Sequence, residues 1–200
     1  MESTKEHIML VAFKLFAQKG YKDVSMSMLV KESGLSKGAF YHYFENKEQL
    51  FVESLDNLFF SYTPFNQSED SKLKDSLKEN VQDYIRNARN MIKKMKEQFS
   101  DVNLEQGYYR LMIDAVNYAP NFYKKVIESN EMELKFWKRI FKKAQDQGEI
   151  KADLDIELLA YQFQYVQDGI GLQGVFTGKM EKLYETFEKI FNQIYDIIKN

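Results

Sequence analysis

Residues that interrupt helices are scarce along this 200-residue chain, and this constrains its fold more than any other feature. Only 2 Pro and 9 Gly occur, whereas Lys, Glu, Leu, Gln and Met, which favour helices, are abundant. Hydrophobic residues make up 44% of the chain and charged residues 29%, which is the balance of a globular protein with a core. The sequence therefore predicts an all-α fold of about nine helices: a three-helix head at the N-terminus and a larger helical bundle after it.

Apolar residues recur at helical spacing along most of the chain, and a few turn-forming stretches separate these periodic segments. Ser3 and Glu6 have the spacing of a capping box, and Gly20 stands where the first helix is expected to end. A polar stretch at 63–71, which contains Pro64, is expected to be a loop. After the first helix, the sequence predicts helices around residues 25–34, 37–44, 47–62, 72–98, 104–118, 121–147, 154–177 and 180–199.

Residues 25–44 have the dimensions of a helix-turn-helix, that is, two short helices around a tight turn. Ser25 or Ser27 can cap the first helix, and Gly34 can adopt the positive φ that ends it. Ser36 can cap the second helix, which in this motif enters the DNA major groove. The face that the second helix would expose carries Ser36, Lys37, Gly38, Ala39, Tyr41 and His42.

The side chains on this face suit contact with DNA. Gly38 and Ala39 are small and would let the helix backbone approach the bases. Lys37 and His42 can donate hydrogen bonds to phosphates or base acceptors, and Tyr41 can donate its hydroxyl to a phosphate. The pattern therefore predicts a reading helix for double-stranded DNA.

Lys47 would reinforce this surface, because it stands at the start of the next helix, where free backbone N–H groups and the helix dipole also attract a phosphate. Residues 1–47 contain seven Lys and five acidic residues, a net charge of +2, although the whole chain carries −2 and the remainder therefore −4. This asymmetry favours an N-terminal region that faces DNA.

Four stretches also resemble a known family in their order and spacing: Gly20-Tyr21, Val24-Ser25, residues 33–44 and residues 46–50. Over about residues 8–55 they are similar to the N-terminal signature of TetR-type regulators. The resemblance implies an all-helical homodimer whose DNA-binding head is joined by its fourth helix to a ligand-binding body. The boundaries would then be a helix-turn-helix domain at 1–46 and a ligand-binding and dimerisation domain at 47–200, linked by the helix 47–62.

The resemblance also assigns DNA contacts, with some departures from the family pattern. Val30 stands where such motifs often hold Ala, and Ser25 replaces the commoner Thr. The head contains no Arg, so the bidentate guanine contact of Arg is unavailable and DNA shape and phosphate contacts are expected to carry much of the affinity. By position, the phosphate contacts would be Ser25, Tyr41, His42 and Lys47, with Ser27 and Ser36 as further backbone contacts and Lys37, Gly38 and Ala39 nearest the bases.

The chain beyond residue 60 is rich in aromatic residues and Met. Most of these are expected to form ordinary helix–helix packing, although a subset could line a cavity for a small apolar or aromatic effector. An acidic side chain among them, Asp114 or Asp168, would suit a cationic ligand. The candidate ligand-binding residues are Tyr108, Met112, Tyr161, Tyr165 and Asp168.

The last predicted helix carries an apolar stripe broad enough to pack on more than one neighbour, and we expect it to form a dimer interface. In the preceding helix, Gly169, Gly171 and Gly174 would let helices cross closely or else mark a kinked, weak helix end. A two-fold dimer would present its reading helices about 34–36 Å apart to a palindromic operator. The expected interface residues are Leu183, Phe187, Ile190, Phe191 and Ile194.

Other classes of function find little support in the sequence. The only histidines are His7 and His42, and no metal-ligand spacing, phosphate loop or nucleophile turn is recognisable, so we expect no enzyme, metal or cofactor. The chain has no Cys, no signal-peptide pattern at its start and no bilayer-spanning apolar run, so a cytoplasmic protein without membrane contact is expected. The predicted function is a ligand-responsive transcriptional regulator, a repressor that a small molecule releases from its operator. The alternatives are a helical protein-interaction module and an activator of the same fold.

Overall fold

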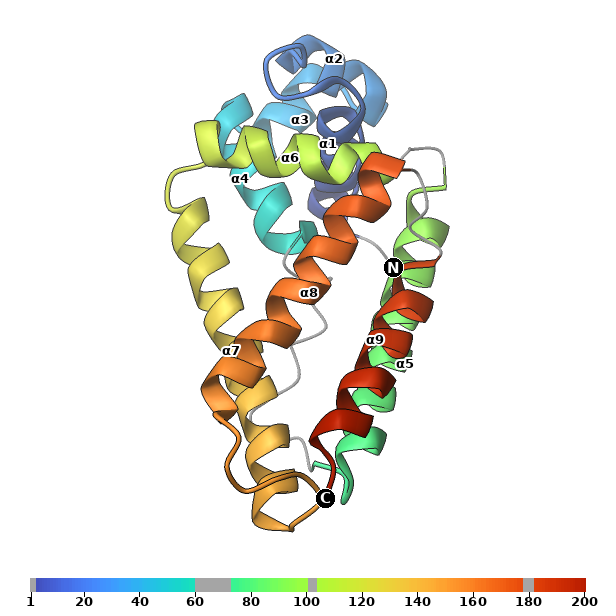
Figure 1. Cartoon of the computed structure of the whole chain (residues 1–200). Helices are drawn as coiled ribbons and strands as arrows, with labels where there is room; N and C mark the ends of the chain where they lie inside the picture. The colour runs from blue at the N-terminus through green and yellow to red at the C-terminus, as the bar shows by residue number, and fades with distance from the viewer. Residues whose placement is uncertain (1–2, 60–72, 101–103, 178–181) are drawn as a thin grey trace. The chain divides into compact units, whose positions relative to one another are not determined.

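The computed structural model describes residues 3–59, 73–100, 104–177 and 182–200. Every regular element assigned in these residues is a helix (Figure 1), which confirms the all-α prediction. None of the helices in the described residues combines the length and apolar character needed to cross a bilayer. The helices are α1 (Thr4–Lys19), α2 (Met26–Ser33), α3 (Lys37–Tyr43), α4 (Lys47–Ser54), the π-helical turn η1 (Leu55–Phe59), α5 (Leu77–Gln98), α6 (Leu104–Tyr118), α7 (Phe122–Asp146), α8 (Ile156–Thr177) and α9 (Leu183–Ile198).

The helix expected at 47–62 differs from the prediction. Its α-helical part ends at Ser54 and continues as η1, and residues 60–62 lie outside the described part of the chain. The N–H of Leu55 is shared between the carbonyls of Phe51 and Val52, and the side chain of Asn57 donates to the carbonyl of Glu53 at 2.8 Å. A side chain that bonds to a carbonyl of the helix competes with the regular backbone pattern, and periodicity alone does not reveal this.

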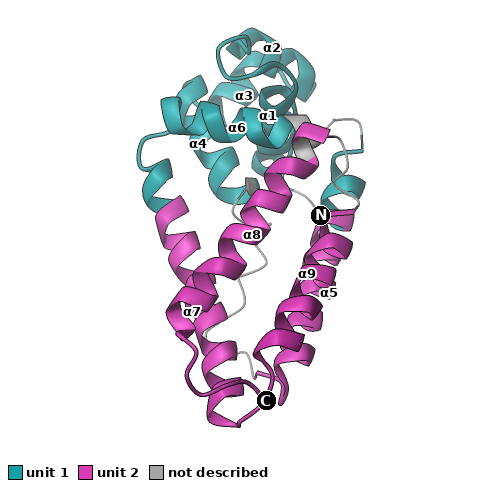
Figure 2. Ribbon diagram, in the orientation of Figure 1, with its two compact units in different colours: residues 1–63, 94–125 teal, residues 64–93, 126–200 magenta. Residues whose placement is uncertain are grey.

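The chain divides into two compact units, coloured separately in Figure 2. Unit 1 comprises Met1–Thr63 and Lys94–Lys125, and unit 2 comprises Pro64–Lys93 and Val126–Asn200. Helices α5 and α7 each run from one unit into the other. This division differs from the boundary expected between residues 46 and 47. That boundary separates a DNA-binding domain from a ligand-binding domain rather than two compact units, and it stays a prediction.

Unit 1 is built around α1, which contacts α2, α4 and α6. The capping box is present, because Glu6 N donates to Ser3 Oγ (3.2 Å) and Ser3 N to the Glu6 carboxylate (2.7 Å). The ring of Phe16 meets that of Phe51 from α4 edge-on, with centroids 4.9 Å apart, and Phe13 lies 5.1 Å from Phe99. Burial of these rings fixes the head on its first helix.

Unit 2 has an aromatic core centred on Trp137 of α7, whose side chain is fully buried. Rings from four helices surround it at centroid distances that favour tilted and edge-on contacts. They are Tyr84 (5.1 Å), Phe163 (5.5 Å), Phe141 (6.0 Å) and Phe187 (6.0 Å).

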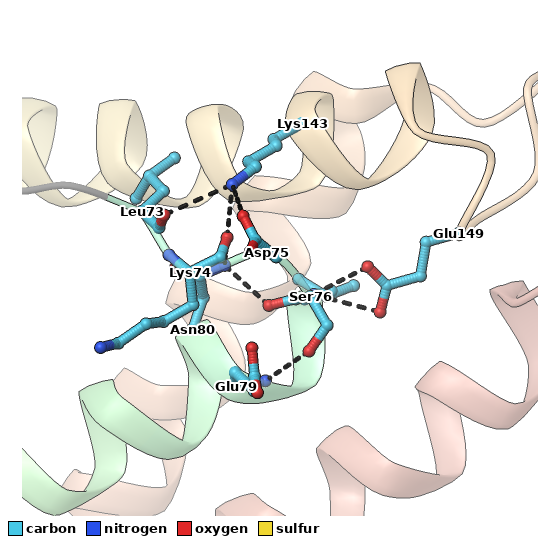
Figure 3. Close-up of polar contacts among 9 residues, drawn as sticks. Leu73, Lys74, Asp75, Ser76, Glu79, Asn80, Lys143 and Glu149 are labelled. Atoms are coloured by element: carbon cyan, nitrogen blue, oxygen red, sulfur yellow. Dashed lines mark hydrogen bonds and ion pairs between the residues drawn. The ribbon is translucent and has the colours of Figure 1, made fainter.

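The N-terminus of α5 is held by side chains distant in sequence (Figure 3). The carboxylate of Glu149 accepts the N–H of Leu77 at 2.8 and 3.1 Å, which satisfies a free donor and complements the helix dipole. Lys143 of α7 donates to the carbonyls of Leu73 and Lys74 at 3.3 and 2.6 Å. The start of α5 is therefore set by tertiary contacts rather than by its own sequence alone.

Candidate nucleic-acid interface

The helix-turn-helix is assembled by local capping. Ser25 Oγ accepts the N–H of Met28 at 3.3 Å and starts α2. Gly34 ends α2 with φ 68°, a left-handed conformation that favours glycine. Ser36 Oγ then accepts the N–H of Ala39 at 3.2 Å and starts α3. The predicted motif is therefore present with its expected boundaries.

The exposed face of α3 carries the side chains expected to meet DNA. Lys37, Gly38, Ala39, Tyr41 and His42 are all exposed. An added methyl group at Gly38 would meet nothing within 4 Å, so this face is open to a partner. The ammonium of Lys37 lies 5.9 Å from the Tyr41 ring centre, which places a positive charge beside an aromatic ring.

The serine hydroxyls also serve inside the head. Besides their roles as caps, Ser25 Oγ and Ser27 Oγ lie 2.8 Å apart and share a hydrogen bond. A hydroxyl that accepts a backbone N–H keeps its own proton for donation. The capping roles of Ser25 and Ser36 are thus compatible with the predicted phosphate contacts, which stay predictions.

Lys47 has an intramolecular use that sequence reasoning missed. Its ammonium donates to the carbonyls of Tyr21 (2.8 Å) and Val24 (2.9 Å) and lies 4.2 Å from the Tyr21 ring centre. It therefore ties the start of α4 to the segment between α1 and α2. The contact with a phosphate predicted for Lys47 is a separate role and stays a prediction.

Helix α6 is joined to the C-terminal end of α1 by two polar contacts within unit 1. The Asp114 carboxylate accepts the N–H of Tyr21 at 2.7 Å. The Arg110 guanidinium donates to the carbonyls of Ala17 and Gln18, which lie in the region where a helix leaves its acceptors unpaired. These contacts couple α6 directly to the DNA-binding head.

Close packing completes the joint between α1 and α6. A Cβ added to Gly107 would lie 2.9 Å from the Ala17 Cβ and 3.1 Å from its carbonyl oxygen, so only glycine fits there without a shift. The ring of Tyr21 stacks on that of Tyr118 at 4.7 Å. A glycine inside an otherwise helical pattern was the one sequence signal for this approach. Asp114, which the sequence suggested as a group for a cationic ligand, accepts the N–H of Tyr21 in the structure.

The candidate ligand-binding residues are divided between the two units. Tyr108 and Met112 are partly buried on α6 in unit 1. Tyr161, Tyr165 and Asp168 lie on α8 in unit 2, where the Tyr161 and Tyr165 rings stack at 5.6 Å. Tyr165 is 64% exposed. Their grouping into one pocket stays a prediction.

The side chains expected at the dimer interface have unequal exposure. Leu183, Phe187 and Phe191 are buried within this chain, and Phe187 and Phe191 belong to the unit 2 core. Ile190 and Ile194 are partly exposed. Three of the five residues are therefore used in intrachain packing, because the apolar stripe of α9 faces the protein's own core.

The capped α2–turn–α3 unit, with its open polar face, has the geometry of a helix-turn-helix. The family model described as "Bacterial regulatory proteins, tetR family" matches residues 8–53. This match confirms the resemblance found in the sequence over the N-terminal part of the chain, which contains the helix-turn-helix.

Individual relatives match over short stretches of the chain. A 56-residue stretch is 46% identical to the uncharacterized HTH-type transcriptional regulator YuxN of Bacillus subtilis (strain 168), covering 28% of this chain and 19% of that protein. A 59-residue stretch is 36% identical to the HTH-type transcriptional repressor NemR of Escherichia coli (strain K12), covering 30% of each protein. The matches thus span less than a third of these relatives.

Solved structures resemble the chain over nearly its whole length. The reduced form of Escherichia coli NemR has a TM-score of 0.63 at 18% identity, covering 95% of this chain and 97% of that one. A TetR transcription regulator from Haloarcula marismortui has a TM-score of 0.70 at 18% identity and covers 98% of both chains. At such identities the likeness shows the fold alone.

Proposed function

We propose that this regulator binds a palindromic DNA operator as a homodimer through α3 and that a small effector controls this binding. The observation that carries the proposal is the exposed face of α3, where Gly38 and Ala39 are flanked by Lys37, Tyr41 and His42. Small residues permit close approach to the groove, and the flanking groups can donate to phosphates and base edges. A cytoplasmic location follows from the same proposal, because the operator lies there.

The polar character of this face supports DNA over a protein partner. Docking of another protein would favour apolar anchors in the middle of the surface. The exposed side of α3 instead carries Lys37 and His42. Phe40 is buried, and Tyr41, which is 38% exposed, ends in a polar hydroxyl. Because the head lacks Arg, we expect shape and phosphate contacts to provide much of the operator affinity.

A stripe on α8 supports the homodimer. Leu158, Tyr165 and Leu172 recur every seven residues, and all three are exposed large apolar side chains in this chain. Phe176, one turn further, is 75% exposed. An apolar stripe of this kind, left uncovered by the unit that carries it, is typical of a protein–protein interface. We propose that α8 supplies the main dimer contacts, with Ile190 and Ile194 of α9 beside it.

Effector control would act through the joint between α1 and α6. A ligand changes DNA affinity only by binding one arrangement of the protein better than another. The contacts of Asp114 and Arg110 with the end of α1 give α6 a rigid connection to the head. A coupling of about 1–3 kcal/mol would change operator affinity roughly 5–150-fold. Release by the effector would make the protein a repressor, and effector-promoted binding would favour the activator alternative.

Fluorescence anisotropy with the duplex upstream of the protein's own gene, over a range of salt concentrations, tests DNA binding. An unrelated duplex is the control, and Lys31→Met, an exposed lysine on α2, is the matched control for Lys37→Met. We expect selective binding that weakens with salt, and a smaller preference for the specific duplex in Lys37→Met only, because Lys37 is expected nearest the bases. A folded dimer that binds neither duplex, or equal selectivity in both variants, would contradict the proposed reading helix.

The dimer is tested by sedimentation. Leu172→Glu should dissociate the dimer without unfolding the chain, because this side chain is exposed in the single chain. A dimer of unchanged stability in Leu172→Glu would move the interface away from α8.

A further inference from the structure

The core of unit 2 contains a carboxylate that the DNA-binding mechanism does not use. Glu133 of α7 is only 7% exposed. Its carboxylate accepts the indole N–H of Trp137 at 3.2 Å. Among the described residues, no Lys, Arg or His forms an ion pair with it, and burial raises the pKa of Glu133 to about 7. An acidic group in such a place is unfavourable for the fold alone.

Aromatic residues of three helices lie near this carboxylate. Tyr84 of α5 packs 5.1 Å from the Trp137 ring and 5.9 Å from that of Phe136. Tyr184 of α9 is also close enough to Glu133 for the negative charge to contribute to its raised pKa, after the larger effect of burial. A carboxylate beside aromatic rings is an arrangement that can attract an organic cation.

The neighbouring polar groups are neutral amides and a second carboxylate rather than cations. Gln164 and Gln167 of α8 hydrogen-bond to Glu133, and the Gln164 amide also donates to the carbonyl of Asn130 at 3.0 Å. The side-chain oxygen of Gln167 is buried and has no hydrogen-bond partner among the residues that the structure describes. Asp168 adds a second negative charge nearby. The cluster therefore lacks a positively charged N–H donor.

Arg89 does not supply that donor. Arg89 of α5 acts on the neighbouring Tyr184, but its guanidinium faces Glu188 at 3.5 Å. The described part of unit 2 thus offers Glu133 only neutral donors.

We propose that Glu133 and Gln167, lined by Tyr84 and Trp137, form a subsite for the protonated amine of an aromatic or alkyl amine, and that such an amine is the effector. The ammonium would pair with the Glu133 carboxylate, donate to the Gln167 oxygen and lie against the rings. The effector role rests on the proposed function, whereas the subsite itself does not.

The chain carries its own reporter for this subsite. Trp137 is the only tryptophan, and it donates directly to Glu133. The experiment titrates the full chain with 2-phenylethylamine at pH 8, where the amine is protonated, and follows tryptophan emission. The neutral 2-phenylethanol is the matched ligand control. Glu128→Gln, an exposed glutamate on the same helix, is the matched variant for Glu133→Gln.

We expect a saturable change in emission with the amine, weakened about tenfold or more in Glu133→Gln but not in Glu128→Gln. Absence of saturable binding to the unaltered chain, equal binding by the alcohol, or equal binding by Glu133→Gln would each overturn the subsite. Gln167→Leu removes the second acceptor and should weaken amine binding several-fold. If circular dichroism shows that Glu133→Gln does not fold, unchanged amine binding by Gln167→Leu would overturn the subsite.

Operator binding separates the two proposals. If the amine binds and changes operator affinity by roughly 5–150-fold, the effector role is supported. If operator binding is present and the amine does not bind, only the subsite fails. If the amine binds and no operator is recognised, the proposed function fails while the subsite stands. Amine binding that leaves operator affinity unchanged overturns the effector role.

Discussion

Replacement of Lys47 by Met tests how the head is held together. Met keeps the length and apolar stem of the side chain but removes the ammonium. In the structure that ammonium is 2.8 Å from the Tyr21 carbonyl, 2.9 Å from the Val24 carbonyl and 4.2 Å from the Tyr21 ring centre. The substitution therefore leaves two carbonyls without their donor and detaches α4 from the segment that follows α1.

The size of the effect follows from these contacts. A hydrogen bond from a charged donor contributes about 1.5–3 kcal/mol, and a cation–π contact at an exposed site about 0.5–1 kcal/mol. Lys47 is partly exposed, so water replaces part of what is lost. We expect the free energy of unfolding to fall by about 2 kcal/mol, roughly 4–8 °C in Tm for a chain of this size.

Urea unfolding of Lys47→Met, followed by far-ultraviolet circular dichroism, measures this loss. Lys31→Met, which removes an exposed lysine from α2, is the control and should lose no more than about 0.5 kcal/mol. If the two variants have the same stability, the contacts of Lys47 do not hold the head. A salt slope for operator binding that is also reduced by about 1 would add the phosphate contact that the sequence predicts.

Four further substitutions test other parts of the structure. Gly107→Ala should lower the free energy of unfolding by about 1–3 kcal/mol in urea, because its methyl group collides with α1. Gly38→Ala meets open space, so it should leave unfolding within about 1 kcal/mol but weaken operator binding in anisotropy, since its methyl group lies on the reading face. The pKa of Glu133 is raised to about 7 from an ordinary 4.5. Between these pH values the folded chain binds more protons than the unfolded chain, so the free energy of unfolding falls as pH rises from about 4.5 to 7. Glu133→Gln should flatten this dependence and gain up to about 3 kcal/mol at pH 8 in urea titrations followed by tryptophan fluorescence. Glu149→Ala removes the acceptor of the Leu77 N–H and should cost about 1–2 kcal/mol in thermal unfolding.

Structure set by neighbours in sequence was predictable. Ser25, Ser36 and Asn46 each cap a helix through a backbone N–H three residues ahead, and Gly34 ends α2 with a positive φ. Such contacts depend on residue type and spacing within one helical turn. The all-α class, the helix-turn-helix and its exposed side chains could therefore be inferred before any tertiary contact was known.

Contacts between distant segments were not predictable in the same way. The apolar stripe of α9 indicated a buried face but not what covers it, and the structure shows Phe187 and Phe191 in the protein's own core. Large exposed apolar side chains recur along α8, at Tyr165 and Leu172 among others. Periodicity identifies an apolar face, and only packing decides whether its partner is the same chain or another.

The sequence by itself thus determined the all-α class and the locally capped helix-turn-helix. The tertiary structure alone decided that Lys47 binds the carbonyls of the α1–α2 segment, that Asp114 joins α6 to Tyr21, and that Glu133 is buried where no described Lys, Arg or His forms an ion pair with it. The physical reason is one of range. Helix caps and turns arise within three or four residues, whereas these environments are formed by side chains from separate helices that only the folded chain brings together.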